Sequence, residues 1–279
     1  MIVRCHGSRG SIPVSGGAYL KYGGDTTCLE IRTKNDVIVI VDAGSGIRRL
    51  GNKLLNERRY EYNLVFTHSH WDHMLGFPFF KPIYDERTVI NLMGCVSAQG
   101  DLHALLSQTM IAPFFPVPFD NLKAQINYSD TCGTSFRVDS VEVFPIVLSH
   151  PNQGLGYKFV EDGKTFVFLT DNELAYRHYG SATFDDYAAF SRKADLLVHD
   201  AEFTAEEYKK TRAWGHSTYK DALNLAMKAE VKHLGLFHHN QDRDDAAEDR
   251  IVQECREIIE KKGLDMGCTA LTQTATFQL

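Results

Sequence analysis

The sequence contains no long apolar run. No window approaches the roughly 18 uninterrupted apolar residues that a membrane-spanning helix needs. The first ten residues, MIVRCHGSRG, include no apolar core of the kind that secretory signals carry. The six cysteines are scattered without a close CxxC pair, which disfavours a disulfide framework or a thiolate zinc site. We therefore expect a cytoplasmic protein with reduced cysteines and no membrane partner.

An excess of basic residues is also lacking. The chain has 30 Lys and Arg against 36 Asp and Glu, a formal net charge of −6. This balance argues against a protein that holds nucleic acid through a broad basic surface, although a local basic patch stays open. No repeat, low-complexity tract or Pro/Ser-rich linker divides the sequence, so we expect residues 1–279 to form a single domain.

Hydrophobic patterning predicts a protein of mixed α/β type. Apolar runs bounded by turn residues predict strands at 2–5, 27–33, 36–42, 63–67, 87–93, 135–147, 155–161, 164–169, 195–199, 232–238 and 270–278. Helices are predicted at 46–58, 97–110, 182–194, 204–213, 218–230 and 243–262, and a Pro-broken aromatic loop at 111–124. Strands such as VIVIVD and DLLVH suit burial on both faces, which favours packed sheets with helices outside.

The densest chemical signal is the hexapeptide HSHWDH at 68–73, directly after an apolar strand. His68 and His70 are two residues apart, so in extended backbone their side chains point the same way, and Asp72 continues this alternation. His73 follows at once, and a turn can direct it to a second position. Imidazole and carboxylate groups suit zinc, or manganese or iron where more oxygen ligands join. Four such side chains together predict a metal site.

Further motifs accompany the hexapeptide: VDAGSGIRRLG at 41–51, LSHP at 148–151, FLTDNE at 168–173, LLVHDAEFT at 196–204, WGHST at 214–218 and LFHHN at 236–240. Together they resemble the metallo-β-lactamase superfamily, and WGHST with HDAEFT resembles its ribonuclease Z-like, phosphodiesterase branch. The resemblance implies a four-layer αββα sandwich, in which two mixed β-sheets carry helices on their outer faces. It also implies that metal ions lie at one edge between the sheets.

The resemblance implies a binuclear metal centre. One ion would be held by His68, His70 and His150, and the other by Asp72, His73 and His238, with Asp171 bridging the pair. The residues agree with this scheme, since His150 and Asp171 each follow an apolar run and so belong at strand ends. LFHHN also offers His239, but adjacent strand residues face opposite sides, and the match to the family favours His238.

His216, in WGHST, has two interpretations. It precedes a Ser-Thr helix-start signal and could be a satisfied histidine at a helix N-terminus. In ribonuclease Z-like enzymes the matching His-Ser-Thr element contacts substrate phosphate and assists the leaving group. The resemblance therefore implies that His216 is catalytic together with Asp72, and that Asp200, or Glu202, keeps its imidazole protonated. A cation beside a binuclear centre suits a phosphodiester.

The substrate class follows from what surrounds the metals. Two ions would share a bridging hydroxide, but such a centre could cut phosphate esters, lactones or thioesters alike. A tRNA-processing relative is expected to carry a long arm between the positions of His150 and Asp171, where this chain has only twenty residues. We therefore expect a dimetal phosphodiesterase acting on a small nucleotide-like, cyclic or linear phosphodiester rather than on long structured RNA. The alternatives are a lactonase or other ester or thioester hydrolase, and a non-catalytic metal-binding carrier protein; a homodimer is left open.

Three weaker signals complete the sequence analysis. Asp42 in VDAGSG is expected to hydrogen-bond a loop behind the metal ligands. The Gly-rich stretch at 7–17 is expected to form tight turns near the site rather than a phosphate cradle. Aromatic residues at 113–119 and Tyr22 could stack a nucleobase, with plain packing as an equal alternative.

Overall fold

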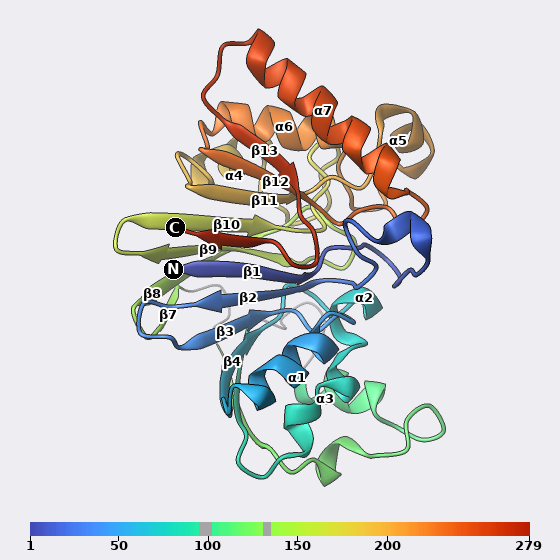
Figure 1. The fold of residues 1–279 in the computed structure, drawn as a ribbon, viewed down its shortest axis with the longest axis vertical. Helices are drawn as coiled ribbons and strands as arrows, with labels where there is room; N and C mark the ends of the chain where they lie inside the picture. The colour runs from blue at the N-terminus through green and yellow to red at the C-terminus, as the bar shows by residue number, and fades with distance from the viewer. Residues whose placement is uncertain (95–101, 131–134) are drawn as a thin grey trace.

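Two β-sheets lie face to face in the protein (Figure 1). The structure is a computed structural model that describes all residues except 95–101 and 131–134. The first sheet has the spatial order β14 (Thr276–Gln278), β1 (Ile2–Gly7), β2 (Cys28–Arg32), β3 (Ile38–Val41), β4 (Glu61–Val65), β5 (Val89–Gly94) and β6 (Gln125–Asp130). The second has the order β13 (Gly267–Ala270), β12 (His233–Phe237), β11 (Leu196–Asp200), β10 (Lys164–Leu169), β9 (Leu155–Glu161), β8 (Val141–Val147) and β7 (Phe136–Val138).

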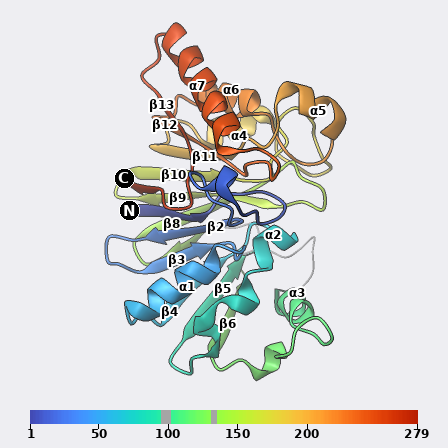
Figure 2. The same ribbon diagram turned by 45° about the vertical axis from the view of Figure 1, so that its right-hand side comes forward.

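Helices cover the outer faces of both sheets, as Figure 2 shows from a second direction. Beside the first sheet lie α1 (Ile47–Asn56), the short α2 (Trp71–Met74) and α3 (Leu102–Thr109). Beside the second lie α4 (Phe184–Phe190), α5 (Ala205–Thr211), α6 (Tyr219–Lys228) and α7 (Asp245–Lys261). The predicted αββα class is therefore confirmed. Within the described part of the chain, no helix is both long and apolar enough to cross a membrane.

Three apolar clusters hold these layers together. The central cluster packs the inner faces of the two sheets against each other, with Ile31 and Val41 from one sheet and Phe159 and Phe168 from the other. A second cluster packs α1 onto the first sheet, and a third packs α4, α6 and α7 onto the second. Where both faces of a strand are covered, apolar runs such as IVIV in β3 and LLV in β11 follow, as the sequence pattern indicated.

Five strand ends meet at one edge of the sandwich. β10, β11 and β12 run parallel, so their carboxyl ends point the same way, and β4 is parallel to both of its neighbours. Candidate site residues follow or end β4, β8, β10, β11 and β12. This topology explains how side chains from distant parts of the chain come together, since parallel strands deliver their carboxyl ends to a common edge.

The structure corrects several predicted elements. The strand β6 was missed, because its polar sequence QINYSD lacks an apolar pattern. The stretch predicted as one strand at 135–147 is the hairpin β7–β8, which turns at Asp139 with φ 53°. The stretch at 270–278 is also not one strand: β13 ends the second sheet, and β14 crosses to pair with β1. Of the helix predicted at 97–110, residues 97–101 lie outside the described part.

Candidate metal centre

Two overlapping groups of four side chains could each hold a metal ion, and a third group, Asp200, His216 and His238, shares His238 with the second. The first consists of His68, His70, His150 and Asp171, and the second of Asp72, His73, Asp171 and His238. In each group, one ligand atom from every residue lies within 4.8 Å of the others. The structure thus brings together all seven side chains named from the sequence. Asp171 is common to both groups, which is the position that a bridging ligand needs.

The converging atoms are ones that a cation would satisfy. The Nε2 atoms of His68 and His73 are buried and have no hydrogen-bond partner among the described residues. Nε2 of His150 lies 3.0 Å from Nδ1 of His70. Buried polar atoms without partners are costly in a folded protein. Nitrogen lone pairs and carboxylate oxygens gathered in this way fit a divalent ion, so the residues present suit a metal centre.

Charges in the site favour a cation as well. Burial, only partly offset by Asp171, lowers the pKa of His150 to about 3, so this imidazole is neutral and able to ligate. At His73 and His238, burial alone would lower the pKa, but Asp171 and the neighbouring carboxylates raise it above its ordinary value. The carboxylates around these two rings create a negative potential. A bound metal ion would neutralise it in place of protons on the rings.

A second layer of hydrogen bonds orients the imidazoles. His73 donates from Nδ1 to Asp42 at 2.8 Å, and His238 donates from Nδ1 to Glu202 at 2.9 Å. Nδ1 of His150 lies 3.0 Å from the carbonyl oxygen of Gly215. In each case the bond fixes the tautomer and leaves Nε2 to face the centre. Asp42 therefore lies behind the ligands as expected, whereas the link between Glu202 and His238 was not foreseen.

The N-terminal loop supports the centre from the other side. The backbone N–H of Ser11, at φ 61°, donates to Asp72 at 2.9 Å. Gly10 lies so close to His238 that a Cβ there would be 2.3 Å from Nδ1 of the ring. The Gly-rich stretch therefore forms a tight turn against the site, as predicted. Its direct bond to Asp72 was missed, because no sequence signal links residues 61 positions apart.

His216 lies against both groups of candidate ligands. Its ring stacks on His238 at a centroid distance of 4.6 Å and meets His150 edge-on at 5.2 Å. Nδ1 donates to Asp200 at 2.8 Å, and Glu202 lies 3.4 Å away. Burial alone would lower the pKa of His216, but Glu202 and Asp200 raise it to about 9. Both carboxylates that the sequence offered therefore act on this ring.

The two adjacent histidines of LFHHN face different surroundings. His238 adopts φ 57° directly after β12 and belongs to the second ligand group. His239 donates from Nε2 to the carbonyl oxygen of Leu271 at 2.8 Å, and its Nδ1 lies 3.1 Å from Glu248. Only His238 is therefore in reach of an ion at this centre.

Comparisons with known proteins agree with the fold and the motifs. Residues 38–239 match the family model of the beta-lactamase superfamily domain, and the chain belongs to this family. It is 26% identical to a Ribonuclease Z of Lactococcus lactis subsp. cremoris strain MG1363, over 82% of this chain and 87% of that protein. The resemblance to the ribonuclease Z-like branch of the superfamily is thereby confirmed.

Solved structures show the same fold at lower identity. The metallo-beta-lactamase fold protein YhfI of Bacillus subtilis aligns with a TM-score of 0.71 and 15% identity, over 99% of this chain and 98% of its own. A diphosphatase from the PhnP family aligns with a TM-score of 0.68 and 17% identity, over 100% of this chain and 97% of its own. The architecture is therefore shared along the whole chain.

Proposed function

We propose that this protein is a dimetal phosphodiesterase whose substrate is a small, nucleotide-like cyclic or linear phosphodiester. The family and the divalent-metal ligand groups support a metal-dependent hydrolase. The observation that carries the choice of phosphodiester is the hydrogen bond from His216 to Asp200 beside both groups, where Asp200 and Glu202 raise the pKa of the imidazole and so favour its cation. A cation at this position would bind a lactone or thioester less strongly, because the reacting carbonyl group of these substrates carries no charge before attack.

The residues would divide the work in the following way. His68, His70 and His150 would hold one ion, Asp72, His73 and His238 the other, and Asp171 both. Two divalent ions, when bound, activate a water molecule and polarise a phosphoryl oxygen. His216 would bind the phosphate and, because its Nδ1 donates to Asp200, would offer the proton on Nε2 to the leaving oxygen.

Zinc is the ion that this donor set favours most. Five imidazole nitrogens and two carboxylates form a nitrogen-rich set, which suits zinc better than an all-oxygen site would. Manganese and iron also accept imidazole and carboxylate together and stay as alternatives. Metal analysis after purification, followed by reconstitution with each ion, distinguishes them.

The small size of the substrate is supported by the segment between His150 and Asp171. Its twenty residues lie within the described part of the chain and form the β9–β10 hairpin, which closes through Asp162 and Gly163, both at positive φ. No protruding arm that could grip a large RNA emerges from these residues. RNA is nevertheless the competing substrate, because the relatives are named Ribonuclease Z.

The deciding experiment compares leaving groups on metal-loaded protein. Bis-p-nitrophenyl phosphate, a cyclic nucleotide, a lactone and precursor tRNA are offered to the wild type, to His216→Ala and to the control His233→Ala. A ribose alkoxide needs a proton far more than p-nitrophenolate does. His216→Ala should therefore slow the cyclic nucleotide by about 10²–10⁴-fold and bis-p-nitrophenyl phosphate much less. His233 lies at the opposite end of β12 and should matter for neither substrate.

Two outcomes contradict the proposal. Hydrolysis of the lactone with no diester cleaved would make the protein a carboxylic-ester hydrolase. Metal binding without hydrolysis of any of the four substrates would favour the carrier protein. If His216→Ala slows the hydrolysis of both diesters equally, His216 only binds the phosphate. If His216→Ala loses metal, His216 is a metal ligand.

A further inference from the structure

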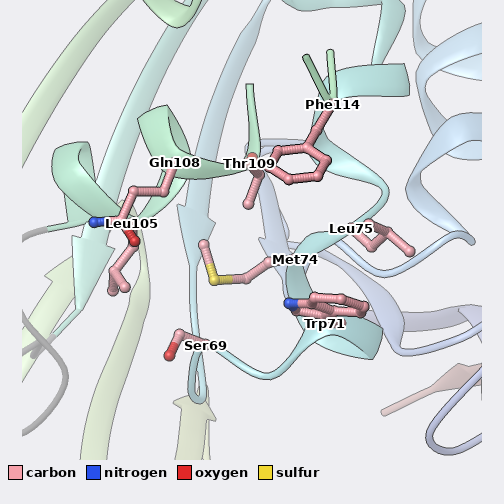
Figure 3. A pocket seen from close by; sticks show the side chains of 8 residues that line it. All are labelled: Ser69, Trp71, Met74, Leu75, Leu105, Gln108, Thr109 and Phe114. Carbon is pink, nitrogen blue, oxygen red and sulfur yellow. The ribbon is translucent and has the colours of Figure 1, made fainter. Parts of the chain in front are cut away.

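A cavity of about 500 Å³ lies beside the candidate metal centre, between residues 69–75 and helix α3 (Figure 3). Its wall is continuous with the site. Ser69 stands between His68 and His70, and Trp71 stands between His70 and Asp72. Ser69 precedes α2 and Trp71 is its first residue; neither joins a ligand group, and both line the cavity. A ligand bound at the metals can therefore extend into it without leaving the protein surface.

Two exposed aromatic rings border this cavity. Trp71 is 77% exposed and Phe114 is 84% exposed, and both rings lie along its rim with Leu75 between them (Figure 3). The buried Met74 and the partly buried Leu105 add apolar surface. Large aromatic side chains are costly to leave in water and gain most from contact with another planar group. The rings are thus available to a ligand.

The remaining lining is polar but uncharged. The side-chain amide of Gln108 forms no hydrogen bond with another described residue, and the hydroxyl of Thr109 donates to Leu106 and can still accept. No charged side chain lines the cavity among the described residues. Such a lining suits a neutral group with hydrogen-bonding edges and does not suit a phosphate, whose place is at the metals and His216.

We infer that this cavity binds the nucleobase of the substrate and sets its specificity. The inference rests on the proposed function, since it takes the metal centre to bind the phosphodiester of the same molecule. A base offers two flat faces to Trp71 and Phe114 and polar edges to Gln108. An alkyl chain could use the apolar surface but not the amide. The volume lies within the range of small-ligand sites, about 300–1,000 Å³.

Binding tests the inference without catalysis. The chain has two tryptophans, so in a Trp214→Phe variant the fluorescence reports Trp71 alone. Thymidine 5′-monophosphate should quench this emission and bind about 5- to 150-fold more tightly than ribose 5-phosphate, since stacking is worth about 1–3 kcal/mol per base. Phe114→Ala should reduce that preference. Leu264→Ala, an exposed apolar position beyond the far end of α7, is the matched control.

Hydrolysis separates this inference from the proposed function. Thymidine 5′-(p-nitrophenyl phosphate) and methyl p-nitrophenyl phosphate share a leaving group and differ in the nucleoside. The ratio of their kcat/KM values should fall in Phe114→Ala and in Trp71→Leu, and Trp71→Phe should restore most of it. If the wild type cleaves neither diester, the proposed function fails. The preference for thymidine 5′-monophosphate over ribose 5-phosphate then still tests whether the cavity binds a nucleobase. Equal affinity for the two phosphates, or tighter binding of octyl phosphate than of the nucleotide, would overturn the inference.

Discussion

Asp42→Asn should lower the affinity for one metal ion and leave the other ion bound. Asp42 is completely buried and accepts three hydrogen bonds: from the N–H of Thr67 at 2.7 Å, from its hydroxyl at 2.7 Å, and from Nδ1 of His73 at 2.8 Å. Asparagine has the same shape, but one of its two atoms is an NH₂ group that cannot accept. Either orientation of the amide therefore sets one donor against another.

The size of the effect follows from these contacts. Loss of a partner that orients a metal-ligating histidine lowers metal affinity by about 10- to 100-fold. This corresponds to about 1.4–2.7 kcal/mol of binding free energy. The free energy of unfolding of the metal-free protein should also fall by about 1–3 kcal/mol, the cost of a buried donor left without a partner. His70 and His150 make no hydrogen bond to Asp42, and His68 is linked to it only through the hydroxyl of Thr67, 3.1 Å from its Nδ1, so their ion should lose less affinity.

Competition with a chelating dye measures the affinity of each ion, and thermal denaturation of the metal-free protein measures the loss of stability. Tyr157→Phe is the matched control, because it removes one buried hydrogen bond, to the carbonyl oxygen of Phe66 at 2.8 Å, without touching a ligand. Two ions bound as tightly in Asp42→Asn as in the wild type would refute the orienting role. Loss of metal from Tyr157→Phe would mean that removing any buried hydrogen bond near β4 disrupts the centre.

Four further predictions follow from particular residues. Asp171→Ala should release both ions, since Asp171 belongs to both ligand groups, and metal analysis that finds one ion tightly retained contradicts the bridge. Gly215→Ala should weaken the ion beside His150, because Gly215 has φ +98° and a Cβ would lie 2.1 Å from Nδ1 of that ring; unchanged affinity in a metal titration would disprove this. Cleavage of a nucleotide diester should depend little on salt, whereas efficient tRNA cleavage with a steep salt dependence would show that many phosphates are bound. Burial raises the pKa of the Cys5 thiol to about 12, so the thiol stays protonated at pH 7–9 and should resist a disulfide reagent until the protein unfolds; rapid modification of the native protein would contradict its burial.

The sequence by itself determined the sandwich and most of the candidate ligands. Strand β3 is apolar along its whole length and β11 begins with the apolar run LLV, and this pattern is visible within five residues. The hexapeptide at 68–73 concentrates four candidate ligands in one local segment. Period-two alternation correctly joined His68 with His70, whereas Asp72 lies in α2 and belongs to the other group. The β9–β10 turn was equally predictable, since Asp-Gly suits its positive φ angles.

Only the tertiary structure decided which distant side chains support those ligands. Glu202 is 36 residues from His238, and Asp42 is 31 residues from His73, so neither distance nor orientation could be read from local pattern. Likewise, the chain leaves the second sheet after β13, and β14 pairs with β1 in the first sheet, although β14 begins only six residues after the end of β13. The cavity formed by Trp71 and Phe114 also depends on how α2 and α3 pack. Local sequence fixes backbone preference and the alternation of faces, whereas the partner across a sheet edge is set by how the layers pack together.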